Sequence, residues 1–214
     1  MKALSKPLLV TTAVVVGVVL AGLVVFLFSK AQAPDPAAAE VVSADSHVLD
    51  DAGDDAVTVV EFLDFECEAC GAYYPVVEDL RQKYAGQITY VVRYFPLPGH
   101  FNSTNAAVAA EAAAQQGRFE DMYHRLFETQ AEWGEAQESR AQLFRRYADE
   151  LGLDMSAFDA AVSNPETEQR VQADFEEGRA LGVGSTPTFF VDGQPLVIER
   201  WNDLEVAVQA ALQR

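Results

Sequence analysis

The sequence predicts an α/β domain in which a β-α-β half and a β-β-α half are separated by an all-helical insertion. Three observations predict this fold class. Residues 57–65 form an apolar run rich in β-branched and aromatic residues, which is typical of a strand buried on both faces. Residues 87–95 form a second such run after a helix-like segment, and this order favours a right-handed parallel crossover. Residues 188–198 hold two short strand signals around a tight turn.

The first 28 residues predict a membrane anchor. Residues 8–28 carry no charged side chain, and at about 1.5 Å per residue they can span a bilayer core of about 30 Å. Lysines precede this run, so residues 1–7 are expected to stay in the cytoplasm and the remainder to lie outside. A cleaved signal peptide is the alternative, with a small-residue site at residues 31–33. The length of the run and Pro34 just after that site favour an uncleaved anchor.

Residues 29–46 are rich in Ala, Pro and Asp without sustained periodicity, which predicts a flexible tether. The folded domain is then expected over residues 47–214, starting with a short edge strand at residues 47–49. The formal net charge of -18 at pH 7 falls almost entirely on this part of the chain, because the only charged residues among the first 30 are lysines. A surface this acidic disfavours nucleic-acid binding, and we interpret the negative charge as a means of keeping the domain soluble.

The helices follow from apolar residues at helical spacing. One is predicted over residues 68–85, with a kink at Pro75. The insertion is predicted over residues 102–182, where Asn102 or Ser103 would cap the first helix and the last would begin near Pro165.

The last part of the chain predicts a hairpin and a helix. Strands at residues 188–191 and 196–198 are expected to pair across the Asp192-Gly193 turn. An amphipathic helix should follow with Asn202 as its cap, because Glu205 lies three residues on.

Cys67 and Cys70 are the only cysteines of the chain, and they lie where the first strand ends and the helix begins. At this spacing the two sulfur atoms can come close enough to bond. The helix start places unpaired N–H groups and the positive end of the helix dipole beside Cys67, which favours the reactive thiolate. In an exported chain such a pair meets an oxidising compartment. These residues therefore predict a redox-active dithiol.

This arrangement resembles the thioredoxin-fold superfamily, and within it the DsbA-like thiol-disulfide oxidoreductases. The resemblance covers nearly everything after the tether. It is carried by the C-x-x-C motif behind a buried strand, by Pro75, by the helical insertion, and by the Gly-Val-Gly-Ser-Thr-Pro-Thr-Phe-Phe-Val segment at residues 182–191.

The resemblance implies the roles of particular residues. Cys67 would form the mixed disulfide, and Cys70 would be the buried resolving partner. Thr186-Pro187 would be the cis-proline loop facing the dithiol, where Thr186 backbone groups pair with an extended substrate. Glu61 corresponds to a buried glutamate of the DsbA-like enzymes. Burial should raise the pKa of this carboxyl and suit it to exchange a proton with the resolving thiol.

Two acidic residues near the motif have open assignments. For Glu61, the alternative is a strand-end position where the carboxylate reaches water. Asp64 is expected to face solvent.

The motif departs from the DsbA pattern between its cysteines. The family dipeptide is Pro-His, whereas Glu68-Ala69 stands here with Glu66 adjacent. Carboxylates beside Cys67 are expected to raise the pKa of its thiol and partly oppose the helix terminus. A less stabilised reduced form is a weaker oxidant, so the motif leaves the direction of electron flow open.

No metal site or cofactor is predicted. A tetrahedral zinc site needs two ligands besides the cysteines, and the three histidines lack paired spacing. His100 lies in a loop that could approach the dithiol.

Our leading hypothesis is a membrane-anchored, extracytoplasmic thiol-disulfide oxidoreductase that donates the Cys67–Cys70 disulfide to exported proteins. The resemblance alone implies a membrane partner of the DsbB or vitamin K epoxide reductase type that reoxidises it. The alternatives are an anchored reductase, for example of apo-cytochrome thiols, and a non-catalytic thioredoxin-like binding module. An isomerase is disfavoured, because the sequence shows no second domain for dimerisation.

Overall fold

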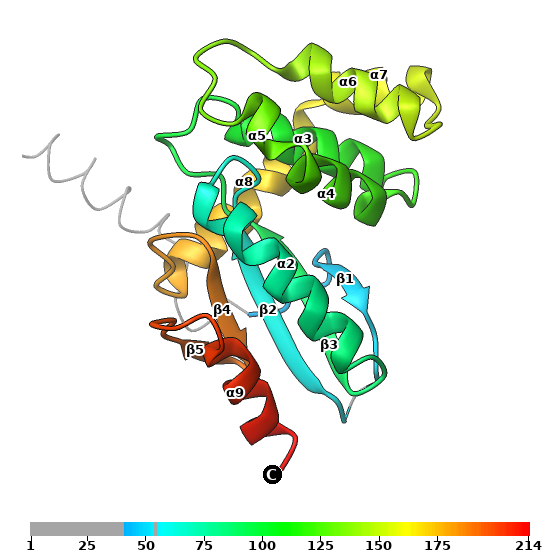
Figure 1. Cartoon of the computed structure of the whole chain (residues 1–214). Coiled ribbons are helices and arrows are strands. Elements are labelled where there is room, and N and C mark those ends of the chain that lie inside the picture. Colours follow the sequence, from blue (N-terminus) through cyan, green and yellow to red (C-terminus); the bar gives the residue numbers. More distant parts are fainter. Residues whose placement is uncertain (1–40, 54) are drawn as a thin grey trace, which may run out of the picture. The chain divides into compact units, whose positions relative to one another are not determined.

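The computed structural model describes residues 41–53 and 55–214 (Figure 1). The predicted cytoplasmic N-terminus (1–7), the predicted anchor (8–28) and most of the predicted tether (29–46) lie outside the described residues. Within the described part, none of the helices combines the length and the apolar character that a membrane crossing requires.

The domain is built on a five-stranded sheet with the order β1-β3-β2-β4-β5. In the middle, β2 pairs parallel with β3 and antiparallel with β4, while β1 and β5 form the edges through antiparallel pairing. The strands are β1 (His47–Asp50), β2 (Val57–Leu63), β3 (Ile88–Tyr94), β4 (Thr188–Val191) and β5 (Gln194–Leu196). The predicted central strand, the parallel crossover and the short N-terminal edge strand are all confirmed.

The crossover between β2 and β3 is α2 (Glu68–Lys83), which continues unbroken past Pro75. Figure 1 shows that it begins directly where β2 ends. The sheet is covered on both faces, as its apolar strands predict. Val59 and Leu63 point into the core that includes α2, whereas Val60 and Phe62 pack on the opposite face with Phe175 of the helix α8 (Pro165–Ala180).

The segment between the two halves is helical, as predicted. It comprises α3 (Ser103–Ala114), α4 (Phe119–Glu128), α5 (Gln130–Trp133), α6 (Ala141–Glu150), α7 (Met155–Ser163) and α8 (Pro165–Ala180). The alanine-rich α3 lies at its centre and contacts α4, α6, α7 and α8. Small side chains permit this close approach from several sides. The four-residue α5 was not expected.

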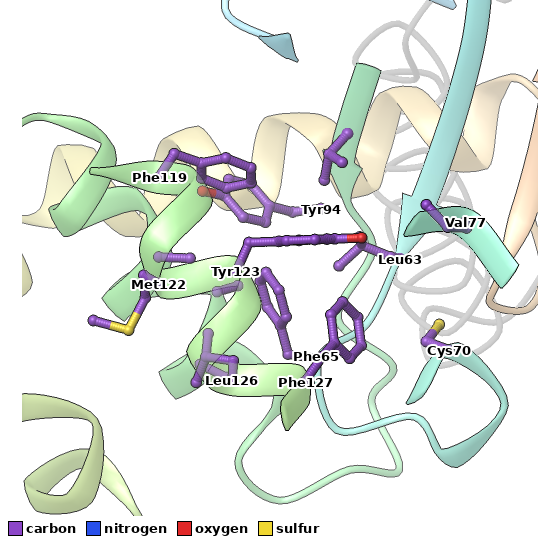
Figure 2. Close-up of a cluster of buried hydrophobic side chains, with 14 of the residues drawn as sticks. Leu63, Phe65, Cys70, Val77, Tyr94, Phe119, Met122, Tyr123, Leu126 and Phe127 are labelled. Carbon is purple, nitrogen blue, oxygen red and sulfur yellow. The ribbon is translucent and has the colours of Figure 1, made fainter. Parts of the chain in front are cut away.

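Aromatic residues join the insertion to the end of β2 (Figure 2). Phe65, which lies between β2 and the cysteine motif, packs against Phe127 and Tyr123 of α4 at ring-centroid distances of 5.1 and 6.2 Å. Cys70 belongs to the same buried cluster. The backbone just before Cys67 is therefore anchored in the core.

Asn102 and Asn202 occupy the predicted N-cap positions, but neither side chain makes a cap hydrogen bond. Asn102 occupies the N-cap position of α3, but its side chain binds the backbone of residues 136–140 instead. Its own N–H donates to Glu66 Oε2, so a distant carboxylate stabilises this helix start. Asn202 precedes α9 (Asp203–Ala211) without a side-chain cap bond, and Asp203 accepts the local backbone N–H groups.

The second hairpin strand begins two residues earlier than expected. Asp192 and Gly193 have φ values of 48° and 72°, which is the left-handed pair that a two-residue hairpin turn requires. Because this turn is so short, Val191 pairs directly with Gln194. The hairpin then ends at Leu196.

Candidate active site

The two cysteines lie at the junction of β2 and α2. Cys67 is the N-cap residue of α2; its N–H donates to Asp64 O at 3.1 Å, and its carbonyl accepts from Gly71 N at 3.0 Å. Both cysteines are free and buried, and Cys70 is only 1% exposed. The Cys67 sulfur is thus held at a helix N-terminus with the second thiol one turn behind it.

The Thr186-Pro187 segment faces Cys67. Antiparallel pairing of β2 with β4 aligns Thr188 with Phe62, which brings the start of β4 to the end of β2. The Thr186–Pro187 peptide bond is cis, as the resemblance implies, and the Cys67 thiol donates to Thr186 O at 3.4 Å. The buried Thr186 Oγ1 has no hydrogen-bond partner among the described residues, so it is available to donate to a thiolate.

The surroundings shift the pKa values of the two thiols in opposite directions. The pKa of Cys67 is lowered from 9.0 to about 6, chiefly by a hydrogen bond from Cys70, against burial, with further help from Thr186 and the N–H groups of Cys70 and Ala69. The pKa of Cys70 is raised well above its ordinary value, first by burial and then by its bond to Cys67. Near neutral pH this arrangement holds one thiolate and one thiol.

The carboxylates near Cys67, which are expected to raise the pKa of its thiol and partly oppose the helix terminus, are outweighed, because the net shift of this pKa is downward. Glu66 Oε2 accepts from Asn102 N at 2.5 Å, and burial raises the pKa of Glu66. Glu68 is exposed, and its pKa is lowered first by a hydrogen bond to its own backbone. Hydrogen bonds at the helix start outweigh charges that are near in sequence.

Glu61 lies on the face of β2 that α2 covers, because strand residues alternate between faces and Val59 and Leu63 share its side. It is 2% exposed, so the alternative of a carboxylate in water is wrong. Tyr90 donates a 2.6 Å hydrogen bond to Glu61 Oε2. Burial raises the pKa of Glu61 to about 7, although the bond from Tyr90 lowers it, and Glu61 interacts electrostatically with Cys70.

The expectation that Asp64 faces solvent is wrong. Asp64 is 2% exposed and closes the turn after β2, where its Oδ1 accepts from Glu66 N at 2.9 Å. Its Oδ2 binds Leu97 N at 2.9 Å and His100 Nδ1 at 2.6 Å. His100, from the loop after β3, therefore reaches the active-site turn.

Gln130 is a site residue that the sequence does not reveal. Its Nε2 donates to Phe65 O at 2.8 Å and to Cys67 O at 2.9 Å, so α5 of the insertion supports the cysteine turn. Gly71 leaves room for this side chain, since a Cβ there would lie 2.0 Å from Gln130 Oε1. A glycine directly after the second cysteine, inside a helix, is the one sequence signal of this close contact.

No group of three or more His, Cys, Asp or Glu side chains suited to a metal ion occurs within residues 41–53 and 55–214. The site is thus built from a thiolate-stabilising cysteine, a buried thiol, a buried carboxyl and a cis-proline loop. This set can exchange a disulfide with another protein's thiols and move one proton in the interior.

Comparison with known proteins agrees with this geometry. Residues 52–210 match the family model described as Thioredoxin. The chain belongs to the thioredoxin family.

Solved structures share the fold of this thioredoxin-family chain. A thioredoxin-like oxidoreductase from Silicibacter pomeroyi DSS-3 is 28% identical with a TM-score of 0.67, over 80% of this chain and 95% of that one. Wolbachia pipientis alpha-DsbA1 is 18% identical with a TM-score of 0.68, over 80% and 93%. MdbA, a thiol-disulfide oxidoreductase from Corynebacterium diphtheriae, is 23% identical with a TM-score of 0.63, over 76% and 89%. The fold is that of DsbA-like thiol-disulfide oxidoreductases, as expected.

Curated relatives are much longer proteins. The Na(+)/H(+) antiporter NhaA 1 of Mycolicibacterium gilvum is 37% identical over 143 residues, which is 64% of this chain and 22% of the antiporter. The Na(+)/H(+) antiporter NhaA of Herminiimonas arsenicoxydans is 39% identical over 140 residues, 65% of this chain and 21% of that protein. The thioredoxin-family chain spans about a fifth of the length of these relatives.

Proposed function

We propose that this protein is an extracytoplasmic thiol-disulfide oxidase, anchored by residues 8–28, that forms disulfides in exported proteins through Cys67 and Cys70. The observation that carries the proposal is the contrast between the two sulfurs. Cys67, with a pKa of about 6, faces Thr186 O at 3.4 Å, while the thiol of Cys70 is buried with a raised pKa.

The reaction begins from the Cys67–Cys70 disulfide. A substrate thiolate attacks Cys67 Sγ, a mixed disulfide forms, and the Cys67–Cys70 bond breaks with its electron pair on Cys70. The Cys70 thiolate is unfavourable because burial raises the pKa of this group. Glu61, whose pKa is raised to about 7 by burial, supplies the proton.

The second step oxidises the substrate. Another substrate thiolate attacks the substrate sulfur of the mixed disulfide, and Cys67 leaves as a thiolate. Its low pKa makes it a good leaving group. The substrate has then lost two electrons and two protons and gained one disulfide, and the enzyme holds the dithiol.

The Cys67 environment favours an oxidase over a reductase. Groups that stabilise the Cys67 thiolate stabilise only the reduced enzyme, because the disulfide carries no charge there, and a stabilised reduced form is the stronger oxidant. A membrane partner of the DsbB or vitamin K epoxide reductase type would return the dithiol to the disulfide. The antiporter relatives join a matching segment to a protein named for ion transport, which supports a membrane setting here as well.

The test compares two activities of the purified full-length protein. In its disulfide form it should refold a reduced, disulfide-containing protein faster than it reduces insulin when supplied with dithiol. Cys67→Ser should abolish refolding. Cys70→Ser cannot form the internal disulfide, and it should accumulate a Cys67 mixed disulfide when it is mixed with a disulfide-containing substrate, because no second thiol resolves the bond. Insulin reduction without oxidative refolding would establish the reductase, and full cellular activity of Cys67→Ser would establish the binding module.

A further inference from the structure

His100 lies outside the cysteine motif, in the loop between β3 and α3. Its Nδ1 is 2.6 Å from Asp64 Oδ2, and the Asp64 side chain is fully buried while that of His100 is 24% exposed. The loop is also fixed through Leu97, whose N–H binds the same carboxylate at 2.9 Å and whose carbonyl accepts from His100 N at 3.0 Å. The imidazole therefore has a defined position at the edge of the site.

Asp64 connects this imidazole to the reactive cysteine. Its main-chain oxygen accepts from Cys67 N at 3.1 Å, and its Oδ1 accepts from Glu66 N at 2.9 Å. One buried residue thus holds the backbone of Cys67 through its carbonyl and the ring of His100 through its carboxylate. Asp64 therefore links the position of the His100 ring to the backbone of Cys67.

The titratable groups with the largest effects on the pKa of His100 are acidic. Asp64, Glu66 and Cys67 come from the turn after β2, Glu68 from the first turn of α2, and Glu135 from the loop after α5. Burial lowers the pKa of His100, but the hydrogen bond and charge of Asp64, followed by the charges of Cys67 and Glu66, raise it overall. These surroundings favour the imidazolium form.

We propose that His100, held by Asp64, is a positioning residue that supplies the cationic partner of the Cys67 thiolate. It takes the place of a histidine between the two cysteines, where this chain has Glu68-Ala69. The inference rests on the proposed thiol-disulfide exchange, because it concerns the thiolate that this reaction uses. The charge of His100 would add to the hydrogen bonds from Cys70, Thr186 and the helix start that lower the Cys67 pKa.

If His100 stabilises the Cys67 thiolate, the thiolate must stabilise the His100 imidazolium to the same extent. This reciprocal effect can be measured without any substitution. The thiolate exists only in the dithiol form, so the attraction between thiolate and imidazolium is lost when Cys67 and Cys70 form a disulfide. The titration midpoint of His100 should then fall by roughly half a pKa unit on oxidation, as expected for two charges separated by several ångströms near a protein surface.

The measurement uses full-length protein labelled with ¹³C-histidine. The chain has three histidines, so three ring signals are followed against pH in the disulfide and dithiol forms. His124, whose Nδ1 is 2.8 Å from Tyr74 OH, is the reference within the same sample. Equal His100 midpoints in the two redox forms would overturn the proposal.

A variant series provides the second readout. His100→Gln should raise the Cys67 pKa by the same half unit or so, measured from the ultraviolet absorbance of the thiolate, and added salt should shrink the difference. His100→Lys should restore part of the shift, and His124→Gln is the matched control. An unchanged Cys67 pKa in His100→Gln would contradict the proposal. These measurements need no substrate. Their outcome is therefore independent of the test that distinguishes an oxidase from a reductase.

Discussion

The hydroxyl of Tyr90 donates a 2.6 Å hydrogen bond to Glu61 Oε2, inside the core on the face of β2 that α2 covers. Both side chains are buried, so this bond sets the orientation of a carboxyl group whose pKa burial raises to about 7. A carboxyl with this pKa exchanges protons readily near neutral pH.

Glu61→Gln should slow disulfide donation by roughly 10²-fold, at the lower end of what general acid catalysis contributes. Glutamine keeps the size of the side chain and an acceptor for Tyr90 but has no proton to give. The measurement is the single-turnover reduction of the Cys67–Cys70 disulfide by a small dithiol.

The pH dependence separates a proton donor from a structural residue. Glu61 is protonated below about pH 7, so the ratio of wild-type to Glu61→Gln rate should fall as the pH rises through this value. A ratio that stays constant with pH would leave Glu61 without a role in proton transfer.

The ionisation of Glu61 should also lower the free energy of unfolding at high pH. Its pKa is raised from 4.5 in the unfolded chain to about 7 in the folded one, so the folded state binds the extra proton and loses stability as the pH rises between these values. At about 1.4 kcal/mol per pKa unit, the loss is about 3 kcal/mol as an upper estimate.

Urea unfolding of the dithiol form at pH 5 and pH 8 measures this loss. Between pH 5 and pH 8, the free energy of unfolding of the wild type should fall relative to that of Glu61→Gln. Glu128→Gln, at an exposed position of α4, should behave like the wild type. Parallel pH profiles for wild type and Glu61→Gln would show that Glu61 does not ionise with a raised pKa.

Alkylation of the dithiol form should be fast and confined to Cys67. Its rate should be half-maximal near pH 6, because that is where the thiolate forms, and Cys70 should stay unmodified because it is buried with a raised pKa. Since the folded-state pKa of Cys67 is depressed from 9.0, its ionisation stabilises the folded dithiol form at high pH, and this contribution is lost as the pH falls through 6. Mass spectrometry of the labelled protein checks the site, and a midpoint near pH 9 would refute the depressed pKa.

Gln130→Ala should destabilise the protein by about 1 to 3 kcal/mol, because the carbonyl of Phe65 loses the Gln130 donor, whereas that of Cys67 keeps the N–H of Gly71. Gly71→Ala should act through the same contact, since the new Cβ would displace the Gln130 amide. The double variant should therefore be no less stable than the worse single variant.

Thermal or urea unfolding of the three variants tests this coupling. Gln172→Ala is the control, because that amide binds Glu176 within the same helix. Additive losses at positions 71 and 130 would mean that the two residues act independently.

Much of the fold could be predicted because its signals are local. The apolar run of β2, the turn at Asp192-Gly193 and the helical spacing of the insertion each lie within one short stretch of sequence. The N-cap positions at Asn102 and Asn202 could be predicted, but the groups that accept the N–H bonds at these helix starts could not, because such a group need not be the cap residue itself. Glu66 reaches Asn102 N across 36 positions of the chain.

The residues of the active site also differ in whether local sequence predicts them. Cys67 and Cys70 are visible because they are neighbours in sequence, and Glu61 is visible because a carboxylate in an apolar strand is unusual. The contacts of Gln130, and the hydrogen bond between Asp64 and His100, join segments that are distant in sequence. No local sequence pattern predicts them. The net shift of the Cys67 pKa could not be predicted, because it depends on hydrogen bonds from Cys70, Thr186 and main-chain N–H groups that only the folded chain brings together.

The reduction potential of the Cys67–Cys70 pair in the full-length protein tests the proposed oxidase most directly. The stabilised Cys67 thiolate predicts a potential well above that of thioredoxin, about -270 mV, and toward that of DsbA, about -120 mV. Equilibration with glutathione buffers gives this value. A potential at or below about -270 mV would contradict the oxidase and assign the protein to the reductases.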